Sequence, residues 1–279
     1  MRLPMNHRFA VMTKPAALFF AAALLPLAPV AAQTRVSSLP AARTPVVVEL
    51  FSSEGCSTCP PADALLKQLE TTQPVPGADV IAIEEHVDYW NHDGWVDPFS
   101  SASWTFRQQD YVSKLKVGTE FTPETVIDGQ SQTSGADTLG TIVLITKAAR
   151  QPRTQVAIIP RKPDGKSAEN FSVSVGKLVN ATRGNTEEVW LAVTEDGLHS
   201  NVSAGENAGH KLNHAAVLRS LTKIGVANPA APATSFSADP RVKISSHWKR
   251  DNLHVVVFVQ EKQSKRIVGA AETRVMRNL

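Results

Sequence analysis

The only two cysteines of the chain, Cys56 and Cys59, form a C-x-x-C where a β-branched run ends and a helical pattern begins. The run covers residues 46–51, and the helical pattern starts at Pro60. A thiolate at the N-terminus of a helix is stabilised by unpaired backbone N–H groups and by the positive end of the helix dipole. The pattern therefore predicts thiol-disulfide chemistry, with Cys56 as the nucleophile and Cys59 as the resolving thiol.

The N-terminal segment has the composition of an export signal. Three basic residues precede an apolar, proline-broken stretch over residues 16–30, and small residues follow up to Ala32. This pattern predicts a signal peptide that is cleaved after Ala32. We favour cleavage over a membrane anchor because the stretch is short and lacks a basic flank on its far side. We therefore expect a periplasmic or secreted protein in an oxidising compartment.

Removal of the signal changes the charge of the chain. The formal net charge is +3, but residues 1–32 hold three basic and no acidic side chains, which leaves 26 basic against 26 acidic residues. A neutral chain lacks the single-signed field that nucleic acid or an anionic membrane requires. We expect a protein thiol or disulfide as the partner, no nucleic acid, no membrane span after signal removal, and no cofactor.

The segments around the C-x-x-C alternate between strand-like and helical patterns. Strands are predicted over 46–51, 80–86 and 125–128, and helices from Pro60 and over 100–116 and 137–150. This order matches the thioredoxin-like plan. A right-handed crossover would make the first two strands parallel neighbours, which would place His86 one strand away from Cys56.

Beyond Pro152 the pattern changes to strand-like runs, several of which alternate apolar with polar residues. They cover residues 155–159, 171–175, 189–194, 242–246, 253–260 and 267–270. We expect a separate antiparallel, sandwich-like domain here. Residues 212–224 fit either a helix or a bulged strand, and residues 227–239 are predicted to form a loop.

The predicted fold class is an α/β thioredoxin-like domain followed by a β-rich C-terminal domain. The expected domain organisation is a signal peptide (1–32), a mobile leader (33–44), the thioredoxin-like domain with the C-x-x-C (45–152) and the β-rich domain (153–279). The 247 residues left after cleavage exceed the usual size of one domain, which is why two are expected.

A second candidate feature is Thr122-Pro123, which precedes the predicted strand over 125–128. In the thioredoxin-like plan a proline at this place is commonly cis and faces the cysteine pair. It would leave the backbone groups of Thr122 free to pair with an extended substrate. An ordinary turn proline is the alternative.

Aromatic and ionisable side chains are concentrated directly after the second predicted strand. His86 would stabilise the Cys56 thiolate or act as an acid and base, and Asp88 would orient it. The alternative is a packed loop in which His86 is only a hydrogen-bonded residue. A carboxylate at Glu54 would disfavour the thiolate unless it turns away from Cys56.

Two other classes of function stay open. Cys56, Cys59 and His86 would suit a copper-binding module, since thiolates and imidazole bind Cu(I). A zinc site would need two further ligands beside the cysteines, of which His86 with His92 or Asp88 are the best candidates. The third possibility is an interaction protein whose disulfide is purely structural.

Several long motifs carry a resemblance to one family. They cover residues 46–51, 55–63, 86–90 and 121–129 in the first half, and 206–209, 213–214 and 217–219 in the second. Together they resemble the exported thioredoxin-like family known as domain of unknown function 1223, over most of residues 45–272. The resemblance implies a thioredoxin-like domain with a C-x-x-C site and a β-rich extension, and it brings no established substrate. The chain departs from thioredoxin itself at 53–55, where thioredoxin has a tryptophan, and at Ser57-Thr58, where it has Gly-Pro. These differences leave the redox potential open.

Overall fold

The folded unit of this computed structural model consists mainly of β-strands. The structure describes residues 42–162 and 168–275, together with Ala10 and Met12. The expected signal peptide and most of the expected leader therefore lie outside the described residues. Among the helices that are described, none combines the length and the hydropathy that a bilayer crossing requires.

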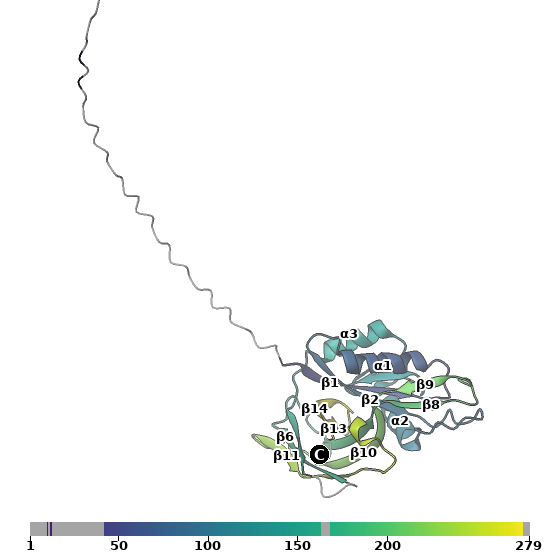
Figure 1. The fold of residues 1–279 in the computed structure, drawn as a ribbon. Helices are drawn as coiled ribbons and strands as arrows, with labels where there is room; N and C mark the ends of the chain where they lie inside the picture. The colour runs from purple at the N-terminus through teal and green to yellow at the C-terminus, as the bar shows by residue number, and fades with distance from the viewer. Residues whose placement is uncertain (1–9, 11, 13–41, 163–167, 276–279) are drawn as a thin grey trace, which may run out of the picture. The chain divides into compact units, whose positions relative to one another are not determined.

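The described residues form three α-helices, one short 3-10 turn and fourteen strands (Figure 1). The helices are α1 (Pro60–Thr72), α2 (Ala102–Leu115) and α3 (Thr138–Ala148), and the 3-10 turn is η1 (Arg250–Asn252). The strands of the first half are β1 (Thr44–Ser52), β2 (Ala78–His86), β3 (Glu124–Ile127) and β4 (Ser131–Ser134). The remaining strands are β5 (Val156–Arg161), β6 (Ala168–Gly176), β7 (Glu187–Glu195), β8 (Leu198–Asn201), β9 (Lys211–His214), β10 (Val217–Val226), β11 (Thr234–Ala238), β12 (Arg241–Lys243), β13 (Leu253–Glu261) and β14 (Ile267–Arg274).

The ends of the helices follow from the local sequence. Helix α1 opens with two prolines, whose missing N–H groups would have had no partner in the first turn. It ends at Gln73, which takes the left-handed conformation and donates its N–H to the Leu69 carbonyl. The N-caps of α2 and α3 are Ser101 and Asp137, and each side chain accepts a backbone N–H of the first turn.

One sheet holds eight strands in the order β14-β13-β7-β10-β2-β1-β3-β4. Strand β2 runs parallel to β1 over its whole length, with Ser52 opposite His86. The expectation of two parallel neighbours is confirmed. Strand β10 is parallel to β2 on its other side, and the remaining pairs in this sheet are antiparallel. The sheet is therefore mixed.

The expected fold class, an α/β thioredoxin-like domain followed by a β-rich domain, is wrong. The protein is mostly β, and strands from both halves of the chain are hydrogen-bonded in the one eight-stranded sheet. The join is made where Glu84 of β2 donates its N–H to the Ala216 carbonyl and lies opposite Val217 of β10. The edge of β2 that faces away from β1 offers backbone groups for pairing, and β10 pairs with it at Glu84.

A second sheet is formed by β11, β6 and β12, and β5 also pairs with β6. Its strand β11 lies inside residues 227–239, which the sequence had suggested as a loop. Residues 212–224, which fitted a helix or a bulged strand, hold β9 and most of β10. Strand β10 has two register shifts against β7, so the bulged strand is the correct interpretation.

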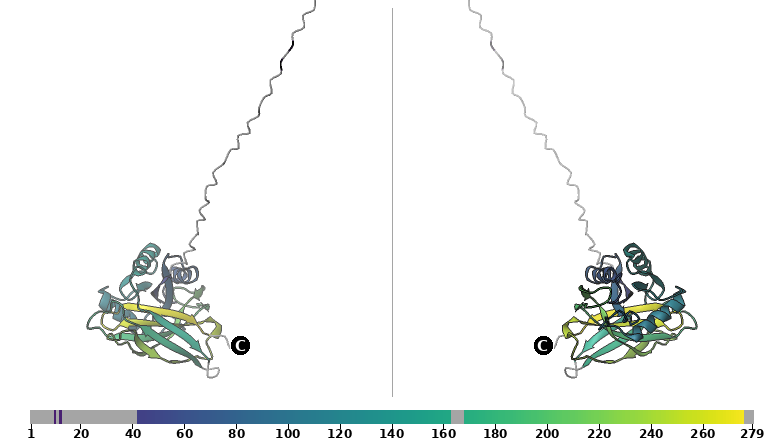
Figure 2. Two further views of the ribbon diagram at one scale, coloured as in Figure 1. Left: turned by 90° about the vertical axis from the view of Figure 1, so that its left-hand side faces the viewer. Right: turned by 90° about the vertical axis from the view of Figure 1, so that its right-hand side faces the viewer.

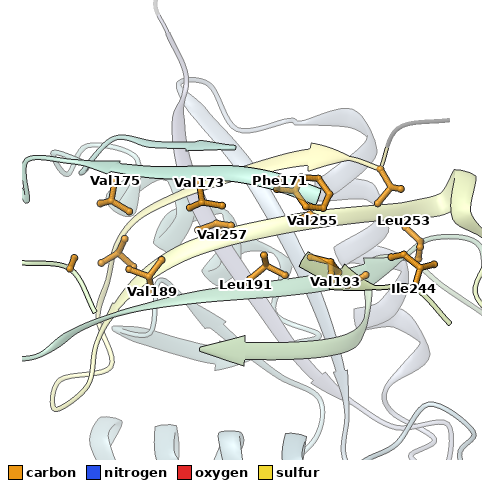
Figure 3. Close-up of a cluster of buried hydrophobic side chains, with 14 of the residues drawn as sticks. Phe171, Val173, Val175, Val189, Leu191, Val193, Ile244, Leu253, Val255 and Val257 are labelled. Atoms are coloured by element: carbon orange, nitrogen blue, oxygen red, sulfur yellow. The ribbon is translucent and has the colours of Figure 1, made fainter. Parts of the chain in front are cut away.

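The two sheets enclose the largest apolar cluster. Valines of β6, β7 and β13 point into the space between them, with Phe171, Leu191 and Leu253 among the larger side chains (Figure 3). A second cluster lies under α1 and α3, on one face of β1 and β2. The views of Figure 2 show these two helices away from the strands of the second sheet. Both faces of the eight-stranded sheet are therefore buried over much of its area.

A third cluster shows how the two halves share a core. It joins Val47, Ile81 and Ile83 of the first half to Val256 and Phe258 of β13. These side chains are at most 1% exposed. Val47, Ile81 and Ile83 would lose Val256 and Phe258 as packing partners if the second half were removed.

The shared core leads to a prediction about a fragment. A chain of residues 42–152 keeps β1 to β4 and all three α-helices, but it exposes the edge of β2 and one apolar face of the sheet. We expect this fragment to show no cooperative thermal unfolding by circular dichroism, whereas residues 42–279 unfold cooperatively. A fragment with dispersed amide signals and a sharp transition would contradict the shared core.

Candidate functional site

Cys56 and Cys59 form a disulfide at the N-terminus of α1, with their Cα atoms 5.5 Å apart. Cys59 is the N-cap residue of the helix, and its carbonyl accepts the N–H groups of Ala62 and Asp63 at 2.8 and 3.1 Å. The N–H of Cys59 donates to the Cys56 carbonyl at 3.2 Å. The disulfide therefore closes a tight turn that leads directly into the helix.

The two sulfur-bearing residues are nearly inaccessible. Cys56 is 1% exposed and Cys59 is 0% exposed, whereas Ser57 and Thr58 between them are on the surface. The hydroxyl of Thr58 lies 3.3 Å from the Cys56 sulfur. A partner would therefore meet the intervening dipeptide before it meets a cysteine.

A loop from the second half of the chain holds the turn in place. The Asn207 side-chain amide donates to the carbonyls of Glu54 and Cys56 at 2.8 and 3.0 Å. The neighbouring Glu206 carboxylate accepts the N–H of Ser57 at 3.0 Å. Sequence analysis noted this segment only as part of the family resemblance. Nothing in the local sequence indicates that it contacts residues some 150 positions earlier.

Trp90 lies between the C-x-x-C turn and the Thr122-Pro123 turn. Its indole N–H donates to the Thr122 hydroxyl at 2.7 Å. A Cβ atom at Gly55 would come within 2.9 Å of the Trp90 carbonyl oxygen, so the close approach requires glycine. The packed-loop interpretation of this aromatic segment therefore holds for Trp90.

The Thr122–Pro123 peptide bond is cis, as expected. A Cβ atom at Gly135 would lie 2.8 Å from the Pro123 Cβ and 2.9 Å from the Ala62 Cβ. Both side chains therefore border Gly135, which places the proline turn beside the first turn of α1.

His86 is fully buried, and both of its ring nitrogens face carboxylates. Nδ1 lies 2.7 Å from Asp97 Oδ2, and Nε2 lies 3.1 Å from Glu84 Oε1. Asp97 also accepts the N–H of Glu54 at 2.8 Å. The expected partner Asp88 is instead bonded to the Thr105 hydroxyl. Asp97 therefore takes the orienting role that sequence analysis gave to Asp88.

His214, the last residue of β9, extends this buried network. Its Nδ1 lies 2.8 Å from Glu84 Oε1, and its Nε2 lies 3.1 Å from Glu54 Oε1. The second oxygen of Glu54 accepts the indole N–H of Trp95 at 3.0 Å. Asp63 lies beside the network, with Oδ2 3.9 Å from His214 Nδ1. The Glu54 carboxylate therefore turns away from the cysteines and into the interior.

Burial and the neighbouring charges act against each other on these groups. Burial would lower the pKa of His86, but the charges of Asp97 and Glu84 outweigh it and hold the pKa well above its usual range. For His214, burial is likewise outweighed by Glu84, and the pKa rises to about 9. Burial opposes ionisation of Glu84, yet His214 and His86 hold its pKa at about 2. Burial and the charge of Glu84 raise the pKa of Asp63 to about 7.

The structure does not bring together the metal ligands that the sequence suggested. The cysteine sulfurs are bonded to each other, and the His86 nitrogens contact Glu84 and Asp97. His92 is exposed and stacks on Trp90, with ring centroids 5.9 Å apart. A copper or zinc site that joins the cysteines to His86 is therefore not assembled in this structure.

The network of Glu54, Glu84, Asp97 and His214 around His86 was missed by sequence analysis. One local signal was available, because Glu84 and Glu85 are consecutive acids directly after the apolar run over residues 80–83. They point to opposite faces of β2. Glu85 joins a separate buried cluster with Arg107, whose guanidinium also contacts Glu49.

Glu124 follows the cis proline, and its burial predicts that the stability of the fold depends on pH. It is fully buried, it accepts one hydrogen bond from Gln108 at 2.8 Å, and burial raises its pKa from 4.5 to about 7. The folded state therefore binds this proton more tightly than the unfolded chain does, and stability falls as pH rises from 4.5 to about 7. We expect Glu124→Gln to be more stable than the wild type by about 2 kcal/mol at pH 8 and equal to it near pH 4.

The measurement is urea unfolding of both proteins at the two pH values. Glu120→Gln is a control from the same segment, because Glu120 is only partly buried and hydrogen bonds lower its pKa instead of raising it. A Glu124→Gln variant that is less stable than the wild type at pH 8 would show that the buried carboxylate is stabilising instead.

Two solved structures resemble the chain in its fold. Protein AGR_C_4864 from Agrobacterium tumefaciens is 22% identical, with a TM-score of 0.62, and the match covers 85% of this chain and 97% of that chain. HBP35 of Porphyromonas gingivalis is 15% identical, with a TM-score of 0.58, and the match covers 84% of this chain and 76% of that one. At these identities the likeness concerns the fold alone. Among curated proteins there is no significant match.

A sequence match shows the family of the chain. A family model described as protein of unknown function (DUF1223) matches residues 47–260, which include the C-x-x-C turn, the cis proline and the loop with Asn207. The matched range also contains Glu84, His86 and His214. The chain therefore belongs to the family described as protein of unknown function (DUF1223).

Proposed function

We propose that the protein is a thiol-disulfide oxidoreductase that acts on a protein partner. The observation that carries the proposal is the disulfide between its only two cysteines, closed across a C-x-x-C at the N-terminus of α1. This position favours the thiolate that leaves when the disulfide opens. The Thr122-Pro123 turn beside the first turn of α1 supplies backbone groups for an extended partner chain.

The exchange moves two electrons from a partner dithiol to the disulfide. A partner thiolate attacks the Cys56 sulfur, the Cys56–Cys59 bond breaks, and Cys59 leaves as a thiolate. The second partner thiol gives up its proton to Cys59 and attacks the mixed disulfide. This attack falls on the partner sulfur of the mixed disulfide, so Cys56 leaves as a thiolate and takes up the proton that the first partner thiol had lost. The partner then holds a disulfide, and Cys56 and Cys59 are both thiols. The reverse sequence reduces a partner disulfide.

In this proposal the slow step is the access of the partner to Cys56, which is 1% exposed. Ser57 and Thr58 are exposed between the two cysteines. The Glu206 carboxylate accepts the N–H of Ser57, and the Asn207 amide donates to the carbonyls of Glu54 and Cys56. A partner must displace the Ser57 contact with Glu206 to reach the sulfur. His86 is fully buried with both ring nitrogens paired, so in this proposal it supports the turn from within.

We place the reaction in an oxidising compartment, the periplasm or the exterior of the cell. The basic, apolar and small-residue order of residues 1–32 supports this placement. A disulfide that closes without a further cysteine in the chain also fits such a compartment. N-terminal sequencing of the exported protein should then begin at Gln33, and a retained Met1 would contradict the placement.

The roles of the cysteines predict different behaviour of two variants. Reduced Cys59→Ala should form a stable mixed disulfide with a peptide that contains an internal disulfide, because Cys56 can attack and no second thiol resolves the product. Cys56→Ala is the matched control and should form far less, since Cys59 is the resolving thiol in this proposal and does not attack the peptide. The adduct is measured by intact-mass spectrometry. Equal adduct formation by both variants would contradict Cys56 as the nucleophile.

The burial of both cysteines favours a second candidate, a structural disulfide in an interaction protein. The reduction potential separates the two functions. Equilibration of the mature protein with a glutathione series should give about −120 to −270 mV for an exchange catalyst. A value below about −300 mV would instead establish a structural disulfide.

A further inference from the structure

Three possible metal-binding atoms converge inside the protein, below the disulfide. They are Glu84 Oε1, His86 Nε2 and His214 Nδ1, all within 4.8 Å of one another. Glu84 Oε1 lies 3.1 Å from His86 Nε2 and 2.8 Å from His214 Nδ1. Tetrahedral ligands at about 2.0–2.1 Å from a zinc ion lie about 3.3 Å from one another. A small outward movement of these side chains is therefore enough to admit an ion.

Each of the three side chains has a further hydrogen-bond partner at its other polar atom, the one that does not face the centre. The outer nitrogen of His86 faces Asp97 at 2.7 Å, and the outer nitrogen of His214 faces Glu54 at 3.1 Å. The second oxygen of Glu84 accepts the N–H of Ala215 at 3.2 Å. Histidines that bind metals almost always donate their other ring N–H to a carboxylate, a carbonyl or water, which directs the lone pair at the ion. Both histidines here have this arrangement.

The number of donors explains why the centre needs a cation. A neutral imidazole has one N–H, and when that N–H donates outward to Asp97 or Glu54, the inner nitrogen is an acceptor. Two such nitrogens and an oxygen of Glu84 then face one another without a hydrogen between them. Acceptors that lie this close in a buried site repel one another. In this structure protons relieve the repulsion, because the charges of the nearby carboxylates outweigh burial and raise the pKa values of both histidines. One metal ion would take the place of these protons.

The fold assembles the three residues from both halves of the chain. Glu84 and His86 are two positions apart in β2 and therefore lie on the same face of the sheet. His214 ends β9, just before the Ala216 carbonyl that accepts the N–H of Glu84. Figure 1 shows β9 beside α1 and β2. The backbone pairing that joins the halves therefore also positions the third ligand.

A pocket of about 300 Å³ lies next to this centre, between α1 and β9. Asp63, which lies 3.9 Å from His214 Nδ1, is also one of the residues that line this pocket. The pocket brings solvent up to Asp63, and the Asp63 carboxylate supplies a further oxygen beside the ligands.

We propose that Glu84, His86 and His214 bind one divalent transition-metal ion. Two imidazoles and one carboxylate match Zn²⁺ best among the common ions. This site is separate from the cysteines, which are joined to each other in the same structure. The ion would hold β2 and β9 together beneath the C-x-x-C turn, and the proposal does not rest on the redox function.

The test uses the full mature chain with its disulfide intact, dialysed against a chelator and titrated with Zn²⁺ by calorimetry. We expect one ion per chain, and Co²⁺ in place of Zn²⁺ should give the visible absorption of a four-coordinate site. Glu84→Gln and His214→Gln should abolish stoichiometric binding. The double variant Cys56→Ser/Cys59→Ser should bind as the wild type does, which separates a failure of this proposal from a failure of the redox proposal.

His254→Gln is the matched control. His254 belongs to another histidine and carboxylate cluster, with Asp196 and Glu70, and this cluster is only half-buried. The variant should keep one ion per chain. Binding that is lost in His254→Gln and kept in Glu84→Gln would move the site to that cluster and overturn the proposal.

Circular dichroism shows whether Glu84→Gln and His214→Gln, the inner variants, are folded. A further variant, Glu54→Gln, keeps all three ligands. Glu54→Gln alters only the group behind His214, and loss of such a group weakens metal binding about 10- to 100-fold. If the inner variants do not fold, this shift in affinity decides the question. Absence of stoichiometric Zn²⁺ and Co²⁺ binding by the folded wild type overturns the proposal, as does unchanged affinity in Glu54→Gln.

Discussion

The contact between Glu84 of β2 and residues 214–217 is the interaction on which the rest of the structure depends. Its backbone N–H bonds to the Ala216 carbonyl, and its side chain bonds to His214 and to the N–H of Ala215. The two halves of the chain meet here, and the eight-stranded sheet continues across the join. Because Glu84 is fully buried, its charge needs partners, and removal of one would leave the other uncompensated. The same residue therefore belongs both to the pairing of β2 with β10 and to the buried network.

The disulfide turn is built on this join. Glu54, two residues before Cys56, carries the carboxylate that faces His214, and its carbonyl accepts a hydrogen bond from Asn207. The C-x-x-C is thus held by the second half of the chain on its inner side and at its surface. If the disulfide is reactive, it opens within a turn that these contacts hold in place. If it is structural, the same contacts and its burial protect it from reduction. A metal ion at Glu84, His86 and His214 would tighten the same junction. The redox and metal proposals therefore concern two neighbouring sites, which Glu54 connects.

The local features of the site were predictable from the sequence, and their partners were not. The C-x-x-C at the start of a helix follows from a short pattern. The parallel pairing of β1 with β2 was expected from the right-handed crossover, and the cis Thr122–Pro123 bond was expected only within the thioredoxin-like plan. The pairing of His86 with Asp97 rather than Asp88 depends on how residues 88–97 fold back, and no periodicity encodes that path. The contacts of Asn207 and His214 with Glu54 span some 150 residues, so they exist only once the sheet has formed.

Most of the secondary structure was therefore determined by the sequence itself, because helix caps, apolar periodicity and β-branched runs act within a few residues. The tertiary structure decided the fold class. An open strand edge at β2 can be left at the surface, covered or paired, and the local pattern is the same in all three cases. Here β10 pairs with it, which turns an expected α/β domain and a separate β-domain into one mixed sheet with a shared core. The buried carboxylates and histidines follow from the same event, since only the joined sheet brings His214 to Glu84 and gives their charges partners.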